Sequence, residues 1–253
     1  MSSNPPLDPA GFIARFANAA ERAGFRLTRF GEIQGYPLLA CVRSAPPGAP
    51  AIYVSSGIHG DEPAPPVALL RLLEEGFFDD RAHWYVAPLL NPTGFAARRR
   101  ENFQGLDLNR DYLAPQSAEV QAHIAWLQGQ PRFDLTLCVH EDWEATGFYL
   151  YELNPEGRPT LANAMITAAR EHCPIDPAAV IDDRPVDEPG IIRPVSDPLL
   201  RERWPEAIYL RRHHCTLGYT LETPSTLPLE QRIATHRAVL RTAVSEFLAR
   251  PGL

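Results

Sequence analysis

The feature that most constrains the fold is the alternation of short apolar runs with segments of helical period. Apolar residues recur at the three- and four-residue spacing of amphipathic helices in residues 8–23, 63–75, 118–127, 160–172 and 229–248. Largely apolar runs, typical of strands buried on both faces, cover residues 51–55, 84–90 and 135–139, and further strands are expected at residues 149–153 and 215–221. Strands that alternate with helices predict an α/β fold: a mixed, mostly parallel twisted sheet with helices on both faces.

The residues before the first buried run are expected to belong to the same domain. A helix at residues 8–23 is followed by two short strands, 25–30 and 37–42, which are expected to pair as a hairpin. No internal repeat and no linker of domain-boundary length is visible in the sequence. Residues 1–253 are therefore predicted to form a single domain, which includes the N-terminal helix and hairpin in residues 1–50.

Length, charge and residue types exclude several classes of protein. The chain has 253 residues, enough for one large domain, and its net charge of −7 predicts no affinity for nucleic acid or an anionic membrane. It contains no lysine, which excludes a lysine Schiff base, a P-loop lysine and a Ser-Lys dyad. The four cysteines form no C-x-x-C pair and are expected to be reduced, buried thiols. Without a signal-peptide pattern or a transmembrane-length apolar stretch, a cytoplasmic protein is expected.

A candidate metal-binding motif follows the apolar run 51–55. His59 and Glu62 have HxxE spacing, so both side chains can bind one ion from a single turn of backbone. This spacing also occurs by chance in surface loops, so how strongly it indicates a metal site depends on the other residues of the chain. A catalytic site needs a third ligand from elsewhere and an open position for water.

Further polar residues follow other predicted strands. In open α/β sheets ligands bind at the carboxyl ends of strands, and His59, His140 and Glu222 are all expected just beyond such ends. If they converge in one cleft, His59, Glu62 and His140 form a His₂Glu set, a recognised ligand arrangement for one hydrolytic zinc ion. Glu222 is then the best candidate to take a proton from the attacking water and pass it to the leaving amine. The arginine-rich segment 98–110 supplies candidates to stabilise an oxyanion and to bind a carboxylate.

Several motifs in this order carry a resemblance to a known family. They are His59-Gly-Asp-Glu62, Asn91-Pro-Thr-Gly-Phe95, the string R-x-N-x-x-G-x-D-L-N-R at 100–110, His140, and Leu221-Glu-Thr223. Together they resemble the zinc metallocarboxypeptidase family, typified by carboxypeptidase A, and are closest in style to compact bacterial members such as murein peptide amidase. The landmarks run from about residue 52 to residue 225. The R-x-N-x-x-G-x-D-L-N-R string is highly specific, whereas HxxE is not.

The resemblance implies a zinc carboxypeptidase-like catalytic domain with one zinc ion per chain. His59, Glu62 and His140 would be the zinc ligands. Glu222 would be the general acid/base, and Asp107 would accept a hydrogen bond from the metal-binding His59, an orienting role. Glu141 and Asp142, next to His140, are weighed as rival bases, but neighbours of a ligand more often tune it or face solvent.

The resemblance also implies how the substrate would be held. Arg100 would stabilise the oxyanion, while Asn109 and Arg110 would hold the terminal carboxylate of a peptide or peptide-like small molecule. The family's mobile tyrosine, which closes over the substrate, has no matching position, and Tyr209 and Tyr219 are the candidates left open. Arg98, Arg99 and the adjacent pair His213-His214 are interpreted as surface or structural residues.

Three functional hypotheses remain. The leading one is a zinc metallopeptidase that cleaves an amide bond next to a free carboxylate. The second is an N-acyl amino acid deacylase of the succinylglutamate desuccinylase/aspartoacylase type, and the third is a non-catalytic peptide-binding module. The specificity pocket is expected between residues 182 and 214, where several arginines favour an acidic substrate or, as the alternative, simply face solvent. Residues 182–203 are expected to form a surface excursion.

Overall fold

The computed structural model describes residues 8–194, 197–215 and 217–250. Residues 1–7, positions 195 and 196 of the predicted surface excursion, and position 216 of the predicted strand 215–221 lie outside the described residues. The helices are α1 (Pro9–Arg22), α2 (Ala64–Glu74), α3 (Pro92–Ala97), α4 (Ala118–Gln128), α5 (Ala162–Arg170), α6 (Glu206–His213) and α7 (Leu229–Leu248), with short 3-10 turns η1 (Leu108–Arg110) and η2 (Pro198–Leu200). No helix in these ranges is both long and apolar enough to cross a membrane.

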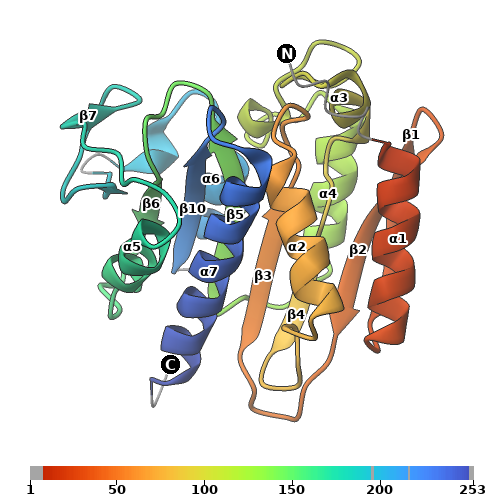
Figure 1. Cartoon of the computed structure of the whole chain (residues 1–253). Coiled ribbons are helices and arrows are strands. Elements are labelled where there is room, and N and C mark those ends of the chain that lie inside the picture. The colour runs from red at the N-terminus through yellow and green to blue at the C-terminus, as the bar shows by residue number, and fades with distance from the viewer. Residues whose placement is uncertain (1–7, 195–196, 216, 251–253) are drawn as a thin grey trace.

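An eight-stranded sheet forms the centre of the molecule, in the order β1-β2-β4-β3-β5-β10-β6-β9 (Figure 1). Its strands are β1 (Arg26–Ile33), β2 (Tyr36–Arg43), β3 (Ala51–Ser56), β4 (His83–Ala87), β5 (Leu135–Asp142), β6 (Tyr149–Leu153), β9 (Ile191–Ile192) and β10 (Gly218–Pro224). The four central strands are parallel to one another, while β2 and β6 flank them in the antiparallel direction. This topology confirms the predicted mixed, mostly parallel sheet.

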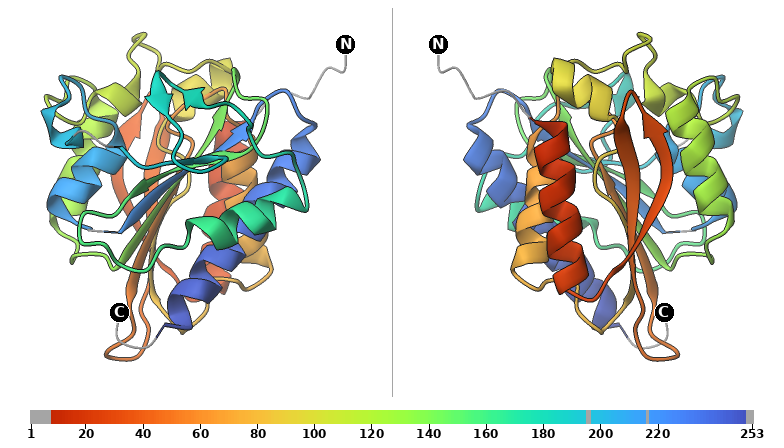
Figure 2. Two further views of the ribbon diagram at one scale, coloured as in Figure 1. Left: turned by 90° about the vertical axis from the view of Figure 1, so that its left-hand side faces the viewer. Right: turned by 90° about the vertical axis from the view of Figure 1, so that its right-hand side faces the viewer.

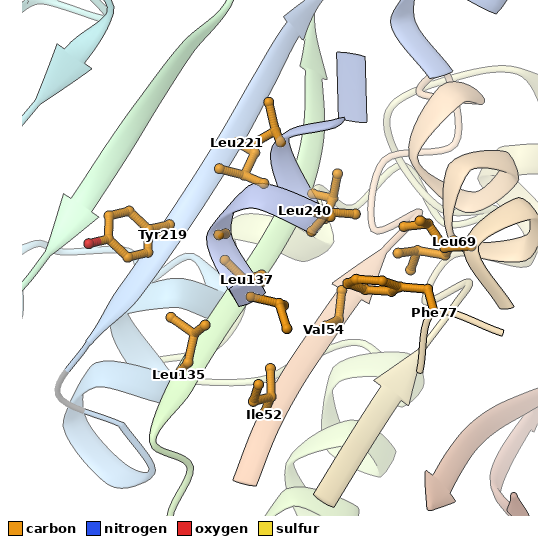
Figure 3. Close-up of a cluster of buried hydrophobic side chains, with 14 of the residues drawn as sticks. Ile52, Val54, Leu69, Phe77, Leu135, Leu137, Tyr219, Leu221 and Leu240 are labelled. Atoms are coloured by element: carbon orange, nitrogen blue, oxygen red, sulfur yellow. The ribbon is translucent and has the colours of Figure 1, made fainter. Parts of the chain in front are cut away.

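Helices cover both faces of the sheet, as predicted (Figures 1 and 2). α1, α2, α5 and α7 share one apolar core with the sheet, and α4 and α6 share the other. Strand β3 serves both cores because successive side chains point to opposite faces: Ile52 and Val54 lie in the first core and Tyr53 in the second. Figure 3 shows the first core, with Leu137 of β5 beside Leu240 of α7.

Several element boundaries differ from the sequence prediction. Helix α3 is not among the predicted helices. The side chain of its N-cap residue Asn91 accepts a hydrogen bond from the Gly94 N–H at 2.8 Å. The predicted strand 84–90 ends at Ala87, and the predicted strand 215–221 lies at 218–224 instead. Helix α6 was not predicted. Its polar sequence hides the helical period, although a proline followed by an acidic residue is a helix-start signal that could have revealed it.

The predicted surface excursion is only partly at the surface. It begins in the turn of a two-stranded hairpin, which is formed by β7 (Val180–Ile181) and β8 (Arg184–Pro185). It then adds an edge strand to the main sheet, because Ile191 and Ile192 are buried and β9 pairs with β6. Part of this segment therefore forms the edge strand next to β6 instead of projecting freely into solvent.

Candidate metal centre

Three predicted ligands meet at the carboxyl ends of the central strands. His59 and Glu62 lie in the loop between β3 and α2, and His140 lies in β5, which pairs with β3. All three side chains are buried, and one potential ligand atom from each lies within 4.8 Å of the others. The Glu62 carboxylate bridges the two rings: its Oε2 lies 3.1 Å from Nδ1 of His140, and its Oε1 contacts Nδ1 of His59.

A second carboxylate orients the first histidine. Oδ1 of Asp107 lies 3.3 Å from Nε2 of His59, on the side of the ring that faces away from Glu62. A proton on Nε2 satisfies this contact and leaves the Nδ1 lone pair directed at the cluster. Asp107 is itself fixed, since Nε of Arg100 donates to its Oδ2 at 2.9 Å and the Asn109 N–H donates to its Oδ1 at 2.9 Å. The predicted orienting role of Asp107 agrees with this geometry.

The electrostatics of the cluster favour a cation at its centre. Burial disfavours the charged form of His59, but the carboxylates of Glu62 and Asp107 outweigh this and raise the pKa of His59 to about 8. In turn, His59 and His140 overcome the effect of burial on Glu62 and hold its pKa below the usual range. The two imidazoles and the carboxylate are buried and held in fixed orientations. They match the His₂Glu donor set of hydrolytic metal sites. These residues therefore fit a divalent metal ion.

Glu222 lies beside the metal ligands. It is the neighbour of His140 in the parallel register of β10 and β5, so both side chains emerge on the same face of the sheet. Both residues lie within their strands, which corrects the prediction that they follow the strand ends. Glu222 lines the same cavity as the ligands. Burial, together with the nearby carboxylates of Glu62 and Asp142, raises its pKa well above the ordinary value despite the opposing effect of His140.

Arg100, predicted to stabilise the oxyanion, and the predicted substrate-binding residues Asn109 and Arg110 line one cavity with the ligands, and its volume is about 370 Å³. Oδ1 of Asn109 accepts a hydrogen bond from the Glu206 N–H at 2.9 Å, which leaves the Asn109 amide NH₂ group as the donor for a ligand. Nη1 of Arg110 donates to the Asn109 carbonyl oxygen at 2.8 Å. Arg100 reaches the cavity beside Asp107. Arg100, Arg110 and Asn109 thus place two guanidinium groups and one amide in the cavity that the candidate ligands line.

The two tyrosines considered for substrate closure lie away from this cavity. The Tyr219 hydroxyl donates to Glu152 at 3.0 Å and accepts from the Leu161 N–H at 2.9 Å. Tyr209 packs in the second core against Tyr112, with ring centroids 5.7 Å apart. Neither tyrosine is among the described residues that line the cavity.

Two other tyrosines, which the sequence did not single out, do line the cavity. The Tyr149 hydroxyl donates to Oδ2 of Asp142 at 2.8 Å, and the Tyr151 hydroxyl donates to Oδ2 of Asp182 at 2.7 Å. Both tyrosines come from β6, next to β10 in the sheet. The Tyr149 hydrogen bond also shows that Asp142 is engaged in the cavity wall.

Glu141 is not a rival base, because it is a buried structural residue. Its Oε1 accepts a hydrogen bond from Arg232 of α7, and its Oε2 accepts from the Ala64 N–H at 3.0 Å. Ala64 is the first residue of α2, which begins two positions after Glu62. Glu141 therefore ties the start of α2 to β5 and α7, and this connection fixes the loop that carries His59 and Glu62.

A buried polar network behind the site was also missed. The Glu206 carboxylate accepts hydrogen bonds from the Tyr53 hydroxyl at 2.6 Å and the Ser55 hydroxyl at 2.9 Å. The Tyr53 oxygen lies 3.0 Å from Nε2 of His123, a histidine to which no role was assigned. Because the Glu206 N–H donates to Asn109, this network positions one of the predicted substrate-binding side chains.

Comparisons with known proteins agree with this geometry. Residues 48–247 match the family described as the succinylglutamate desuccinylase/aspartoacylase catalytic domain. Carboxypeptidase SOL1 of Arabidopsis thaliana is 31% identical over 141 residues, which are 46% of this chain and 28% of that protein. The match thus spans less than a third of that curated relative.

Solved structures share the whole fold. A proposed metallopeptidase from Shewanella amazonensis is 30% identical, with a TM-score of 0.84 over 95% of this chain and 94% of that one. Another, from Shewanella denitrificans, is 25% identical, with a TM-score of 0.82 over 97% and 98%. A metallo-carboxypeptidase from Pseudomonas aeruginosa, in complex with (2-guanidinoethylmercapto)succinic acid, is 22% identical, with a TM-score of 0.64 over 94% and 69%. This last similarity supports the fold alone.

Proposed function

Because this chain belongs to the succinylglutamate desuccinylase/aspartoacylase catalytic-domain family and has a zinc carboxypeptidase-like fold, we propose that it is a zinc-dependent hydrolase. Its reaction is the cleavage of an amide bond next to a free carboxylate. The observation that carries the proposal is the buried group of His59, Glu62 and His140, with Glu222 beside it in one cavity. This combination supplies a metal site and a proton-transfer group within reach of the same substrate.

His59, Glu62 and His140 would hold the zinc ion, with the His59 ring oriented by Asp107. Bound zinc would supply Lewis acidity, which makes water nucleophilic near neutral pH and polarises the scissile carbonyl. Glu222 takes the proton of the attacking water and delivers it to the departing nitrogen. Burial raises the pKa of Glu222, which favours the delivery of the proton to the departing nitrogen once Glu222 has taken it.

The remaining polar groups orient the substrate and stabilise charge. The guanidinium group of Arg100 stabilises the negative charge that develops on the carbonyl oxygen. The Arg110 guanidinium and the Asn109 amide bind the free carboxylate of the substrate, by charge-assisted and neutral hydrogen bonds respectively. The cavity of about 370 Å³ has the size of a small-molecule site, which suits a peptide end or an N-acyl amino acid.

Two kinds of substrate fit this proposal. The family match over residues 48–247 favours an N-acyl amino acid, whereas the metallopeptidase and carboxypeptidase relatives favour a peptide. In both, an amide nitrogen departs next to a carboxylate. Zinc-loaded protein, incubated with a small peptide library and a set of N-acyl amino acids, should cleave one set, with products identified by mass spectrometry. Binding without turnover of either set would refute hydrolysis and favour the peptide-binding module.

A further inference from the structure

The loop that joins Arg100 to Asp107 carries two residues of the site on irregular backbone. Both residues line the cavity, and positions 101–106 between them contain no helix or strand. Side chains on such backbone keep a productive geometry only when the surrounding contacts lock them in place. The contacts that hold this loop are therefore part of how the site is built.

Asn102 closes the loop from within. Its side chain is fully buried, and its Oδ1 accepts hydrogen bonds from the N–H groups of Gln104 at 2.9 Å and Leu106 at 3.0 Å. Its backbone N–H donates to the Leu106 carbonyl oxygen at 3.0 Å, so residues 102 and 106 lie side by side. One amide side chain thus satisfies two backbone donors and fixes the shape of the turn.

A buried carboxylate from α4 holds Asn102 in turn. Nδ2 of Asn102 donates to Oε1 and Oε2 of Glu119 at 3.1 Å and 3.2 Å. Glu119 is 2% exposed and lies in the first turn of α4. Val120 and Leu127 anchor the same helix in the second core. The Glu119 carboxylate is therefore a link between the loop and a packed helix.

The opposite side of the loop rests on α3 and on the HxxE segment. The Phe103 N–H donates to Oγ1 of Thr93 at 3.1 Å, and Nδ2 of Asn91 donates to the Arg100 carbonyl oxygen at 3.2 Å. The Gly60 N–H donates to the same oxygen at 3.4 Å. These contacts hold the start of the loop, whereas Glu119 holds its turn.

The two ends of the loop act on the site together. Nε of Arg100 donates to Oδ2 of Asp107 at 2.9 Å, and Oδ1 of Asp107 lies 3.3 Å from Nε2 of His59. If the turn is loose, this ion pair can shift as a unit. The Arg100 guanidinium would then miss the position where negative charge develops on the carbonyl oxygen, which a donor stabilises only from hydrogen-bond distance.

We propose that Glu119 is a positioning residue for hydrolysis: through the Asn102 amide it fixes the loop on α4 and so keeps the Arg100 guanidinium at the oxyanion. The inference rests on the proposed function. Glu119 lies outside the described cavity wall, so it acts through Asn102 and Arg100 and does not touch the substrate. Because the oxyanion forms only in the transition state, losing this support should lower kcat more than it changes KM.

The first test compares replacements of Glu119, with the substrate that the wild-type protein cleaves best. In Glu119→Ala the Asn102 amide loses its acceptor, and kcat should fall about 10- to 100-fold while KM stays within about 2-fold. Glu119→Gln keeps an oxygen that can accept from Asn102 and should retain at least about a third of kcat. Wild-type kcat in the alanine variant, or an equal loss in the glutamine variant, would overturn the proposal.

Glu119→Asp replaces the alanine variant if that protein does not fold. Its carboxylate is one CH₂ group shorter and withdraws from the Asn102 amide, so kcat should fall in the same direction but by less. Wild-type kcat in Glu119→Asp would then overturn the proposal.

A double-mutant cycle tests whether Glu119 acts through Arg100. In an Arg100→Gln background, Glu119→Ala should change kcat by less than about 3-fold, because residues that act through one group are not additive. The same fold-loss in both backgrounds would contradict the coupling.

The matched control is Glu152→Ala. Glu152 is also a buried glutamate that accepts hydrogen bonds from neutral groups, the hydroxyls of Tyr219 and Thr160, and it lies outside the described cavity wall. This variant should lose stability but keep kcat within about 2-fold. A loss of kcat like that of Glu119→Ala would assign both effects to lost stability and overturn the positioning role.

Hydrogen exchange separates this inference from the proposed function. If the zinc-loaded protein cleaves no substrate, the hydrolase proposal fails, and exchange of the Gln104 and Leu106 amides still tests whether Glu119 holds the loop. Both amides should exchange about 10-fold faster in Glu119→Ala than in the wild-type protein, and near the wild-type rate in Glu119→Gln. Equal exchange in all three proteins would overturn the inference.

Discussion

The replacement Gly60→Ala tests whether the HxxE loop depends on close backbone packing. A Cβ atom at position 60 would lie 1.9 Å from the carbonyl carbon of Gly94 and 2.2 Å from the nitrogen of Phe95. Both atoms belong to the backbone of α3, so no side chain can rotate away. Real Cβ contacts are at least 3.0 Å, and the loop and α3 must therefore separate by about 1.1 Å.

The size of the effect follows from this displacement. Overpacking of a buried site typically costs about 1–3 kcal/mol, so the free energy of unfolding should fall by about that amount. Because residue 60 lies between His59 and Glu62, the shift also moves the candidate ligands. A misplacement of about 1 Å in a catalytic site can cost about 100-fold in rate. We expect a loss of this order in kcat/KM and weaker zinc binding.

Urea denaturation, chelator competition for zinc, and steady-state kinetics measure these three quantities. The control is Gly129→Ala at the end of α4, where φ is −85° and the nearest atom that a Cβ would meet is the Trp126 carbonyl oxygen at 3.5 Å. This variant should stay within about 0.5 kcal/mol of the wild-type protein. If Gly60→Ala behaves like the control, the close approach of the loop to α3 does not hold the metal site in place.

Two further predictions concern a catalytic and a buried titratable group. Glu222→Gln should keep zinc but lose about 100- to 10,000-fold in kcat. The control Glu144→Gln, at the exposed rim of the same cavity, should lose little kcat. Wild-type turnover in Glu222→Gln would remove Glu222 from the mechanism. Burial, and to a lesser extent His214, lowers the pKa of His123 from 6.5 to about 3, so the unfolded chain binds more protons between these values and stability falls as the pH drops below 6.5. At pH 5 this effect lowers the free energy of unfolding by about 2 kcal/mol. In His123→Gln, the decrease in unfolding free energy between pH 7.5 and pH 5 should therefore be smaller by that amount than in the wild-type protein. Parallel curves of unfolding free energy against pH for the two proteins would contradict the pKa shift.

The main elements of the fold could be predicted because their signals are local. Strand β3 is a run of six buried residues, and α2 starts at a proline-rich segment, so both are recognisable within a short window of sequence. Helix α6 has only a helix-start signal, the proline before Glu206, and no clear helical period, since its stability comes from contacts with the second core and from the buried Glu206. The prediction also ended β5 and β10 too early, because the two strands remain paired with each other through His140 and Glu222.

The candidate site shows the same division between local and distant information. HxxE is a local motif, and the order of strands brings His140 to it, which is why the grouping of these three side chains could be predicted. The hydrogen bond between Glu206 and Asn109 joins residues 97 positions apart. The hydrogen bond of Tyr151 to the β7–β8 turn likewise depends on how the chain returns to the sheet. Contacts of this kind exist only after the backbone has folded, and no pattern along the sequence encodes them.

The number of zinc ions bound per chain tests the central claim most directly. After loading with zinc and dialysis, metal analysis of the wild-type protein should find one tightly held zinc ion per chain. The His140→Ala variant should bind far less, because two ligands remain, while His172→Ala, whose histidine lies outside the cavity, should bind as the wild-type protein does. Less than one tightly held zinc ion in the wild-type protein, or full occupancy in His140→Ala, would contradict the account.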